Sequence, residues 1–143
     1  MAQSGISVGS DARFDILTAS GVLTLPTLLD FKSKKVDHQT KINPLHGAPI
    51  NLTFPNGWDG SFSVARMDST LDDYFAALEA AQYAGANIAS GTIHQTITEV
   101  NGTLSQYMFQ GVQLYFSDAG DYKALSDVMQ SVSFVAATRT KVL

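Results

Sequence analysis

The sequence has 143 residues, of which 45% are hydrophobic and 15% charged, with no cysteine and a formal net charge of −4 at pH 7. This length suits one domain, and the missing cysteine excludes disulfides, iron–sulfur clusters, cysteine zinc sites and thiol catalysis. The acidic balance argues against a nucleic-acid-binding domain, which usually carries a basic surface. We therefore expect a soluble single-domain protein.

The first ten residues, MAQSGISVGS, are small and polar and are expected to form a flexible arm before a domain of residues 11–143. They lack the basic start and apolar core of a signal peptide. The most apolar stretch is interrupted by Gly21 and Pro26, so no membrane anchor is expected. The letters GISVG match a nucleophile elbow around Ser7, but the strand and helix that an elbow needs are not expected beside it.

Residues 13–23 are expected to form a strand with a break near Gly21, and residues 27–38 suit a second strand whose polar end is rich in lysine. The proline and glycine content of residues 39–50 predicts a loop or the tip of an arm. We therefore expect an extended arm or loop over residues 31–50. Its lysines suit a contact with an acidic neighbour.

Two Asn-Gly pairs lie between β-rich segments, at Asn56-Gly57 and Asn101-Gly102. This pair is typical of a β-hairpin because both of its residues readily adopt positive φ. We predict a hairpin turn at each, although Pro55 intrudes at the first. Residues 118–123 predict a further turn, and residues 126–143 a long final strand.

One helix is predicted, over residues 69–84. Apolar residues recur there at helical spacing: Leu71, Phe75, Leu78 and Ala81. Asp68 or Ser69 is a suitable N-cap, and Ser69 with Asp72 resembles a capping box. The acidic residues near this end favour the positive end of the helix dipole, and Gly85 is well placed to end the helix.

The order of elements predicts a mainly β fold, a β-sandwich or barrel with one flanking α-helix. We expect the helix and sheet to share a core of five residues: Trp58, Phe62, Leu71, Phe75 and Leu78. Two predicted strands place hydroxyl-rich side chains on alternating positions, and these predict a wet sheet face: Thr92, His94, Thr96, Thr98, Ser131 and Ser133.

No catalytic, cofactor or metal motif accompanies these elements. The three histidines, His38, His46 and His94, are scattered and lack a supporting carboxylate set. The paired acids at the helix start are expected to act as caps and dipole partners. We therefore expect no enzyme activity and no cofactor, and we favour a structural protein or a binding module.

Two long segments resemble the phage tail tube proteins of contractile tails. Residues 52–85 combine a Pro-Asn-Gly-Trp turn, a Gly-Ser-Phe strand, an arginine, and an Asp-Ser cap before an acidic helix. Residues 105–142 combine a strand containing Gln-Gly-Val, an Asp-Ala-Gly-Asp turn and a long strand with a basic end. The resemblance extends over about residues 12–142 and depends on the order and spacing of the motifs together.

This resemblance implies a tail tube-like fold that self-assembles into homohexameric rings, which stack into an inner tube for DNA ejection. It implies sheath, baseplate and tape-measure partners, assembly in the host cytoplasm and a final place in the virion. DNA passes through the lumen without specific binding, and the hydroxyl-rich face lines that lumen. The predicted arm reaches the adjacent ring through a basic set: Lys32, Lys34, Lys35, Lys41 and His46.

Two other functions remain open at this stage. The first is a tube protein for secretion or injection, like the Hcp protein of type VI secretion. The second is a soluble ligand-binding β-sandwich, which predicts a stable monomer with an apolar pocket.

Overall fold

A computed structural model describes residues 5–6, 8–19, 21–23, 25 and 27–142. Ser7 of the GISVG motif lies outside these residues. A short 3-10 turn, η1 (Gly9–Asp11), precedes the sheet. The strands are β1 (Ala12–Thr18), β2 (Gly21–Leu23), β3 (Leu28–Ile42), β4 (Ile50–Ala65), β5 (Gly91–Thr98), β6 (Leu104–Asp118), β7 (Met129–Ala136) and β8 (Thr138–Lys141). The helix is α1 (Thr70–Tyr83), so the predicted mainly β fold with one helix is confirmed.

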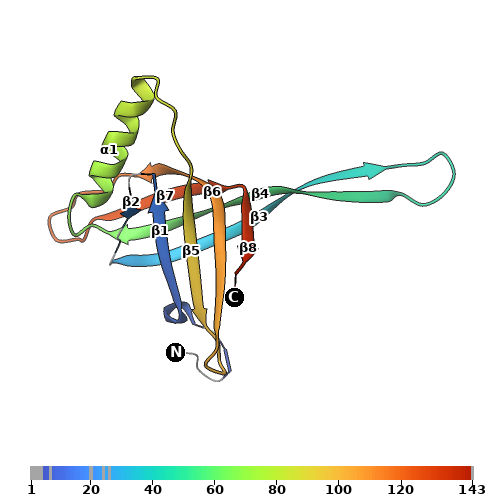
Figure 1. Cartoon of the computed structure of the whole chain (residues 1–143), viewed down its shortest axis with the longest axis horizontal. Helices are drawn as coiled ribbons and strands as arrows, with labels where there is room; N and C mark the ends of the chain where they lie inside the picture. The colour runs from blue at the N-terminus through green and yellow to red at the C-terminus, as the bar shows by residue number, and fades with distance from the viewer. Residues whose placement is uncertain (1–4, 7, 20, 24, 26, 143) are drawn as a thin grey trace.

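All eight strands belong to one antiparallel sheet with the order β2-β1-β5-β6-β7-β4-β3, and β8 also pairs with β6. The long strand β6 joins two halves of this sheet: its first part pairs with β5 and its last part with β7. Figure 1 shows the strands of the two halves crossing. The sheet folds over itself, but it does not close into a barrel, because no ladder joins its end strands β2 and β3 in the described chain.

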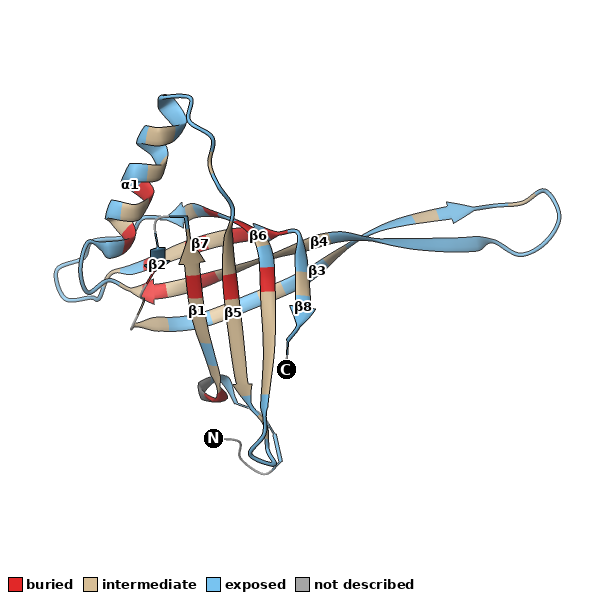
Figure 2. Cartoon of the chain, viewed as in Figure 1, coloured by how far each residue is buried: buried red, intermediate tan, exposed pale blue. Residues whose placement is uncertain are grey.

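The core lies between the two halves of the sheet (Figure 2). Its most buried apolar side chains come from both halves: Phe62, Ile93, Phe109, Val132 and Phe134. At the open side, the rings of Phe14 in β1 and Phe31 in β3 stack with centroids 4.0 Å apart. Aromatic packing therefore closes a gap that backbone hydrogen bonds leave open.

The helix packs its apolar stripe against the end of the second half of the sheet. Leu71 and Phe75 are buried, and the ring of Phe75 stacks on that of Phe116 in β6 at 4.5 Å. At the C-terminal end, the amide of Gly85 donates to the carbonyl of Gln82 and that of Ala86 to the carbonyl of Ala81. With Gly85 at φ 77°, these two bonds form the Schellman ending that the glycine predicts.

The predicted capping box is wrong. The hydroxyl of Ser69 donates to Asp73 Oδ2 at 2.9 Å, and it makes no cap bond to the backbone. Asp68 caps instead, because its Oδ1 accepts the amide of Thr70 at 3.0 Å. Asp72 turns away from the cap toward the sheet.

One of the two Asn-Gly predictions is confirmed and the other is wrong. Asn101-Gly102 turns between β5 and β6, with the Gly102 amide donating to the carbonyl of Glu99. Asn56-Gly57 lies inside the continuous strand β4, opposite a register shift in β3. There Gly57 has φ 90°, and a Cβ would lie 2.8 Å from the carbonyl oxygen of Ala136. The pair forms a β-bulge, which glycine favours for the same reason that it favours turns.

A two-stranded hairpin extends beyond the sheet (Figure 1). We call residues 36–57 the projecting hairpin, because β4 pairs with β7 only from Trp58 onward. Its strands pair from Asp37 opposite Pro55 to Ile42 opposite Ile50. The predicted arm of residues 31–50 differs from the structure at both ends: residues 31–35 lie within the sheet, and residues 51–57, which the sequence predicts as a separate strand and a turn, project with the rest.

Candidate assembly surfaces

The projecting hairpin has one apolar and one polar face. Register and alternation place six residues on the apolar face: His38, Thr40, Ile42, Ile50, Leu52 and Phe54. The opposite face carries Asp37, Gln39, Lys41, Asn51 and Thr53. Ile50 and Phe54 are 50% and 51% exposed. Because an isolated two-stranded hairpin is only marginally stable in water, this apolar face needs a covering surface.

The basic residues predicted for ring stacking do not form one cluster. Lys32 and Lys34 lie on the outer face of the sheet, opposite Ser61 and Asp59. Lys35 lies at the base of the projecting hairpin, where its Nζ is 3.5 Å from Asp37 Oδ1. Lys41 and His46 are exposed farther along the hairpin and at its tip. These five residues are therefore spread from the sheet to the tip of the projecting hairpin.

Several sheet edges lack a strand partner in the described chain. Two of them are the first part of β1, beyond its pairing with β2, and the outer edge of β3. They border an open hollow of about 620 Å³ whose lining includes Phe14, Phe31 and Gln95. Such edges present unpaired amides and carbonyls that can accept a strand from another chain.

The predicted lumen residues lie on two different surfaces. Thr92, His94, Thr96 and Thr98 lie on the face opposite to buried Ile93, on the outside of the first half of the sheet. Ser131 and Ser133 lie on the outside of the second half, opposite Ser63 and Ser61 of β4. Because the two halves enclose the core, these surfaces face different ways. We call them the threonine face and the serine face.

The five predicted core residues all belong to or contact one cluster. Phe62, Leu71 and Phe75 are buried in it, and Leu78 and Trp58 are partly buried and pack against it. Trp58 lies at the base of the projecting hairpin, edge-on to Phe109 with ring centroids 6.0 Å apart.

A polar network at the helix start is absent from the sequence predictions. Gln130, which is 1% exposed, donates through Nε2 to Asp72 Oδ1 at 2.9 Å and to the carbonyl of Ala119 at 3.1 Å. The other Asp72 oxygen accepts from Arg66 Nε at 2.9 Å. Asp72 thus joins the helix to Gln130 in β7 and to Arg66 in the segment before the helix. Alternation with Val132 and Phe134 places Gln130 on the inward face, but the pattern gives no sign of its partner Asp72, which is distant in sequence.

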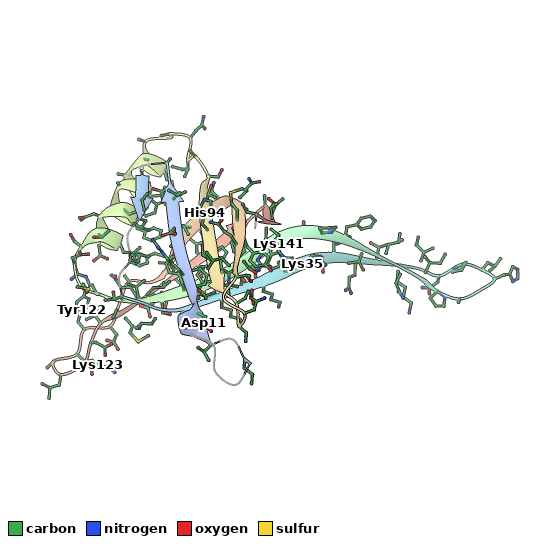
Figure 3. All side chains as sticks on the ribbon, turned by 60° about the horizontal axis from the view of Figure 1, so that its bottom comes forward. Asp11, Lys35, His94, Tyr122, Lys123 and Lys141 are labelled. Carbon is green, nitrogen blue, oxygen red and sulfur yellow. The ribbon has the colours of Figure 1, made fainter. Side chains whose placement is uncertain are left out.

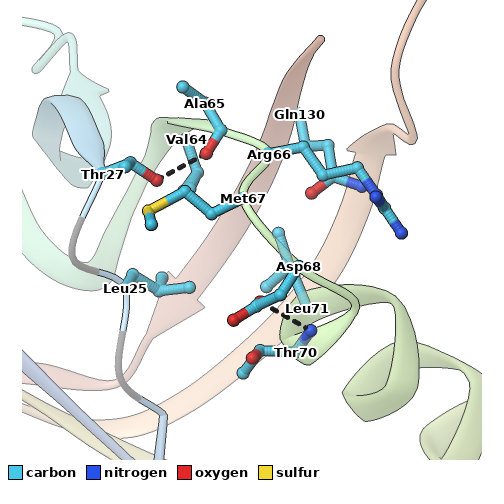
Figure 4. A pocket seen from close by; sticks show the side chains of 10 residues that line it. All are labelled: Leu25, Thr27, Val64, Ala65, Arg66, Met67, Asp68, Thr70, Leu71 and Gln130. Atoms are coloured by element: carbon cyan, nitrogen blue, oxygen red, sulfur yellow. Dashed lines mark hydrogen bonds between the residues drawn. The ribbon is translucent and has the colours of Figure 1, made fainter.

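The Thr70 side chain and amide, as hydrogen-bond donors, hold the pKa of Asp68 below its usual value. Asp68, Arg66 and Gln130 line a small cavity at this point (Figure 4). Its volume of about 20 Å³ is on the scale of a single water molecule, so it is too small for an organic ligand.

Within the described residues, no group of three or more histidine, aspartate or glutamate side chains gathers at metal-binding distance. His38 Nε2 lies 3.3 Å from the hydroxyl of Thr40, its neighbour on the same face of the projecting hairpin. Among the described helices, none is long and apolar enough to cross a membrane.

The sequence matches no family model and no curated protein. Solved structures with a similar fold come from contractile injection systems. One is the sheath/tube terminator of the extracellular contractile injection system PVC in its extended state (TM-score 0.57, 10% identity, 92% of this chain and 94% of that one). Another is the tube-terminating cap of the anti-feeding prophage (TM-score 0.59, 12% identity, 99% and 93%).

A third similar chain belongs to the baseplate of the anti-feeding prophage (TM-score 0.57, 8% identity, 99% and 97%). At such low identities the comparisons concern the fold. Each covers most of both chains, including nearly the whole of this one. The chain has a tail tube-like fold, shared with chains in tube, cap and baseplate assemblies of contractile systems.

Proposed function

We propose that this protein is a structural subunit that self-assembles into stacked hexameric rings, which form the inner tube of a contractile tail. The projecting hairpin is the observation that carries the proposal. It extends from the sheet with an exposed apolar face. The rest of the chain has a fold that also occurs in a sheath–tube complex. In a stack of rings, the adjacent ring covers this face.

Within a ring, the unpaired edge of β3 accepts a strand from the neighbouring subunit. The pairing extends the sheet around the tube axis and removes an edge that invites uncontrolled association. Six copies related by one rotation close the ring.

The serine face lines the lumen in this arrangement. The projecting hairpin continues from β3 and β4, so a hairpin that reaches the next ring orients this half of the sheet along the tube wall. This face carries Lys32 and Lys34 together with Asp30 and Asp59, so it has no excess of the cations that supply most non-specific affinity for the phosphate backbone. DNA passes such a wall without being held.

The protein acts as a building block without enzymatic activity or cofactor. Its partners in the assembled tail are a surrounding sheath, a baseplate and a tape-measure protein. Assembly takes place in the host cytoplasm, and the finished tube is part of a virion.

An injection tube that carries protein in place of DNA is the second candidate. It is favoured by the similar chains from extracellular contractile injection systems. Nuclease-treated particles distinguish the two: a tail attached to a DNA-filled capsid supports the phage tube, and free particles without nucleic acid support the injection tube.

The test is deletion of residues 38–54, with Asp37 and Pro55 joined by an Asn-Gly turn. Because His38 pairs with Phe54, the cut removes complete cross-strand pairs and leaves the sheet intact. We expect a folded protein that still forms rings in negative-stain images but no longer forms tubes. Wild-type protein that stays monomeric at every concentration contradicts the proposal, and so does a deletion variant that still forms tubes.

A further inference from the structure

Arg139 lies in an aromatic cage at the base of the projecting hairpin. Its guanidinium carbon is 3.8 Å from the centre of the Tyr107 ring, 5.1 Å from Trp58 and 5.6 Å from Phe109. Its Nη2 also donates to Gln95 Oε1 at 3.3 Å. Cation–π contacts on this scale fix the orientation of an arginine while leaving its charge uncompensated.

The cage supplies no carboxylate to Arg139. Its Nε is buried without a hydrogen-bond partner, and no ion pair of the described chain includes this residue. A buried donor on a charged group is costly to leave unpaired, so the arrangement calls for an acceptor from outside the chain.

Two further cations face the same way. Lys141 follows Arg139 by two residues in β8 and pairs with Tyr107, and Lys35 pairs with Trp58. Figure 3 shows Lys35 and Lys141 beside each other at the hairpin base. We call Lys35, Arg139 and Lys141 the arm-base patch. Only Lys35 has an acidic partner in the described chain, Asp37 at 3.5 Å.

The loop of residues 118–127 has the opposite character. It carries Asp118, Asp121 and Asp127 against Lys123 alone, and all four side chains are exposed. Its Tyr122 is 67% exposed and its Leu125 fully so. Figure 3 places Tyr122 and Lys123 at the end of the molecule opposite to the projecting hairpin.

We propose that the acidic loop of one subunit docks on the arm-base patch of the next, with a loop carboxylate on Arg139. The inference rests on the proposed tube, since it names a contact between its subunits. Patch and loop are different surfaces of one chain, so the contact is head-to-tail and repeats through the assembly. It is also the reason that a protein with net charge −4 keeps three cations together, two of which have no acidic partner in the described chain.

The test reverses the charge of the arm-base patch in one variant and the charge of the acidic loop in another. The patch variant carries Lys35→Glu and Lys141→Glu, and the loop variant carries Asp121→Lys and Asp127→Lys. Glu79→Lys is the matched control, because it changes charge at an exposed position outside both surfaces. Circular dichroism and thermal melts establish that every variant folds. Sedimentation velocity and negative staining then measure assembly at low salt, alone and in equal mixtures.

We expect wild type and the control to assemble, and the patch and loop variants each to remain unassembled alone. A mixture of patch and loop variants restores assembly, since each then meets an opposite charge, whereas the patch variant mixed with Glu79→Lys adds no assembled mass beyond what Glu79→Lys forms alone. Trp58 is the sole tryptophan and lies in the cage, so its emission shifts with assembly in wild type and in the restored mixture.

Two results overturn the inference while leaving the proposed tube standing: tubes formed by the patch or loop variant alone, and no restoration on mixing. A shift of Trp58 emission with inorganic phosphate, without any effect on assembly, overturns it in favour of a free-anion site. A wild type that never assembles overturns both the inference and the proposed tube.

Discussion

At the scale of single residues, the start of the helix depends on side chains that face the sheet. Asp72 accepts from Arg66 on one oxygen and from buried Gln130 on the other. The sequence suggested that the acids here serve only the helix dipole. The geometry adds a tertiary link, since Asp72 holds the helix start against β7.

Gln130→Ala is expected to destabilise the fold, because it leaves Asp72 Oδ1 and the carbonyl of Ala119 without their donor. An unsatisfied buried acceptor costs about 1–3 kcal/mol of unfolding free energy. Urea unfolding followed by circular dichroism measures the loss. Gln113→Ala, at an exposed position of β6, is the matched control and should change stability by less than about 0.5 kcal/mol. Equal losses in both variants contradict the network.

Asp68 gives the helix cap an acid sensitivity. Its pKa is lowered in the folded state, so its contribution to stability is full above the unfolded pKa near 3.8 and is lost as pH falls through the folded pKa. We expect Asp68→Asn, which keeps an acceptor for Thr70, to flatten the acid side of the stability curve. Thermal melts from about pH 5 to about pH 2 test this. An unchanged acid slope shows that other carboxylates account for it.

At the scale of elements, the projecting hairpin shows what sequence patterns can and cannot specify. The sequence predicts its proline- and glycine-containing tip. It predicts a loop in place of the second part of β3, and a separate strand ending at Asn56-Gly57 in place of the first part of β4. Asn-Gly tolerates positive φ in a turn and in a bulge alike. Only the pairing of Trp58 with Ala136 and of Lys35 with Trp58 makes it a bulge here.

The two faces of the projecting hairpin are expected to differ in function. Leu52→Ser with Phe54→Ser removes exposed apolar area, so the fold is retained while tubes give way to separate rings. Gln39→Ser with Thr53→Ser, on the polar face, is the matched control and leaves tubes intact. Negative-stain length distributions and sedimentation compare the pairs. Equal shortening in both contradicts an apolar stacking contact.

At the scale of the whole molecule, the helix, the Asn101-Gly102 hairpin and the alternating strands could be predicted from local patterns. The path of the sheet could not. Thr92 and Ser133 both lie next to a buried residue in their strands, yet the fold of β6 places them on different surfaces. Alternation says which side chains avoid the core, and it says nothing about which outer surface they reach. Arg139 and Gln130 were missed for the related reason that their partners are distant in sequence.

The two outer surfaces can be distinguished in assembled tubes by cysteine labelling, because the chain has no cysteine of its own. We expect Thr96→Cys to react with a bulky polymer-linked maleimide in both subunits and tubes. Ser63→Cys should react in subunits but be protected in tubes, where the serine face lines the lumen. Mass shifts on denaturing gels give the readout. The reverse protection pattern assigns the lumen to the threonine face.

The projecting hairpin also has a kinetic consequence. It makes cross-strand contacts only within itself, and its apolar face gains cover only when another surface is already in place. A free subunit therefore binds more favourably to the end of an existing ring stack than to another free subunit. Growth of this kind shows a lag phase that short preformed seeds abolish, and it lengthens a few tubes in place of starting many.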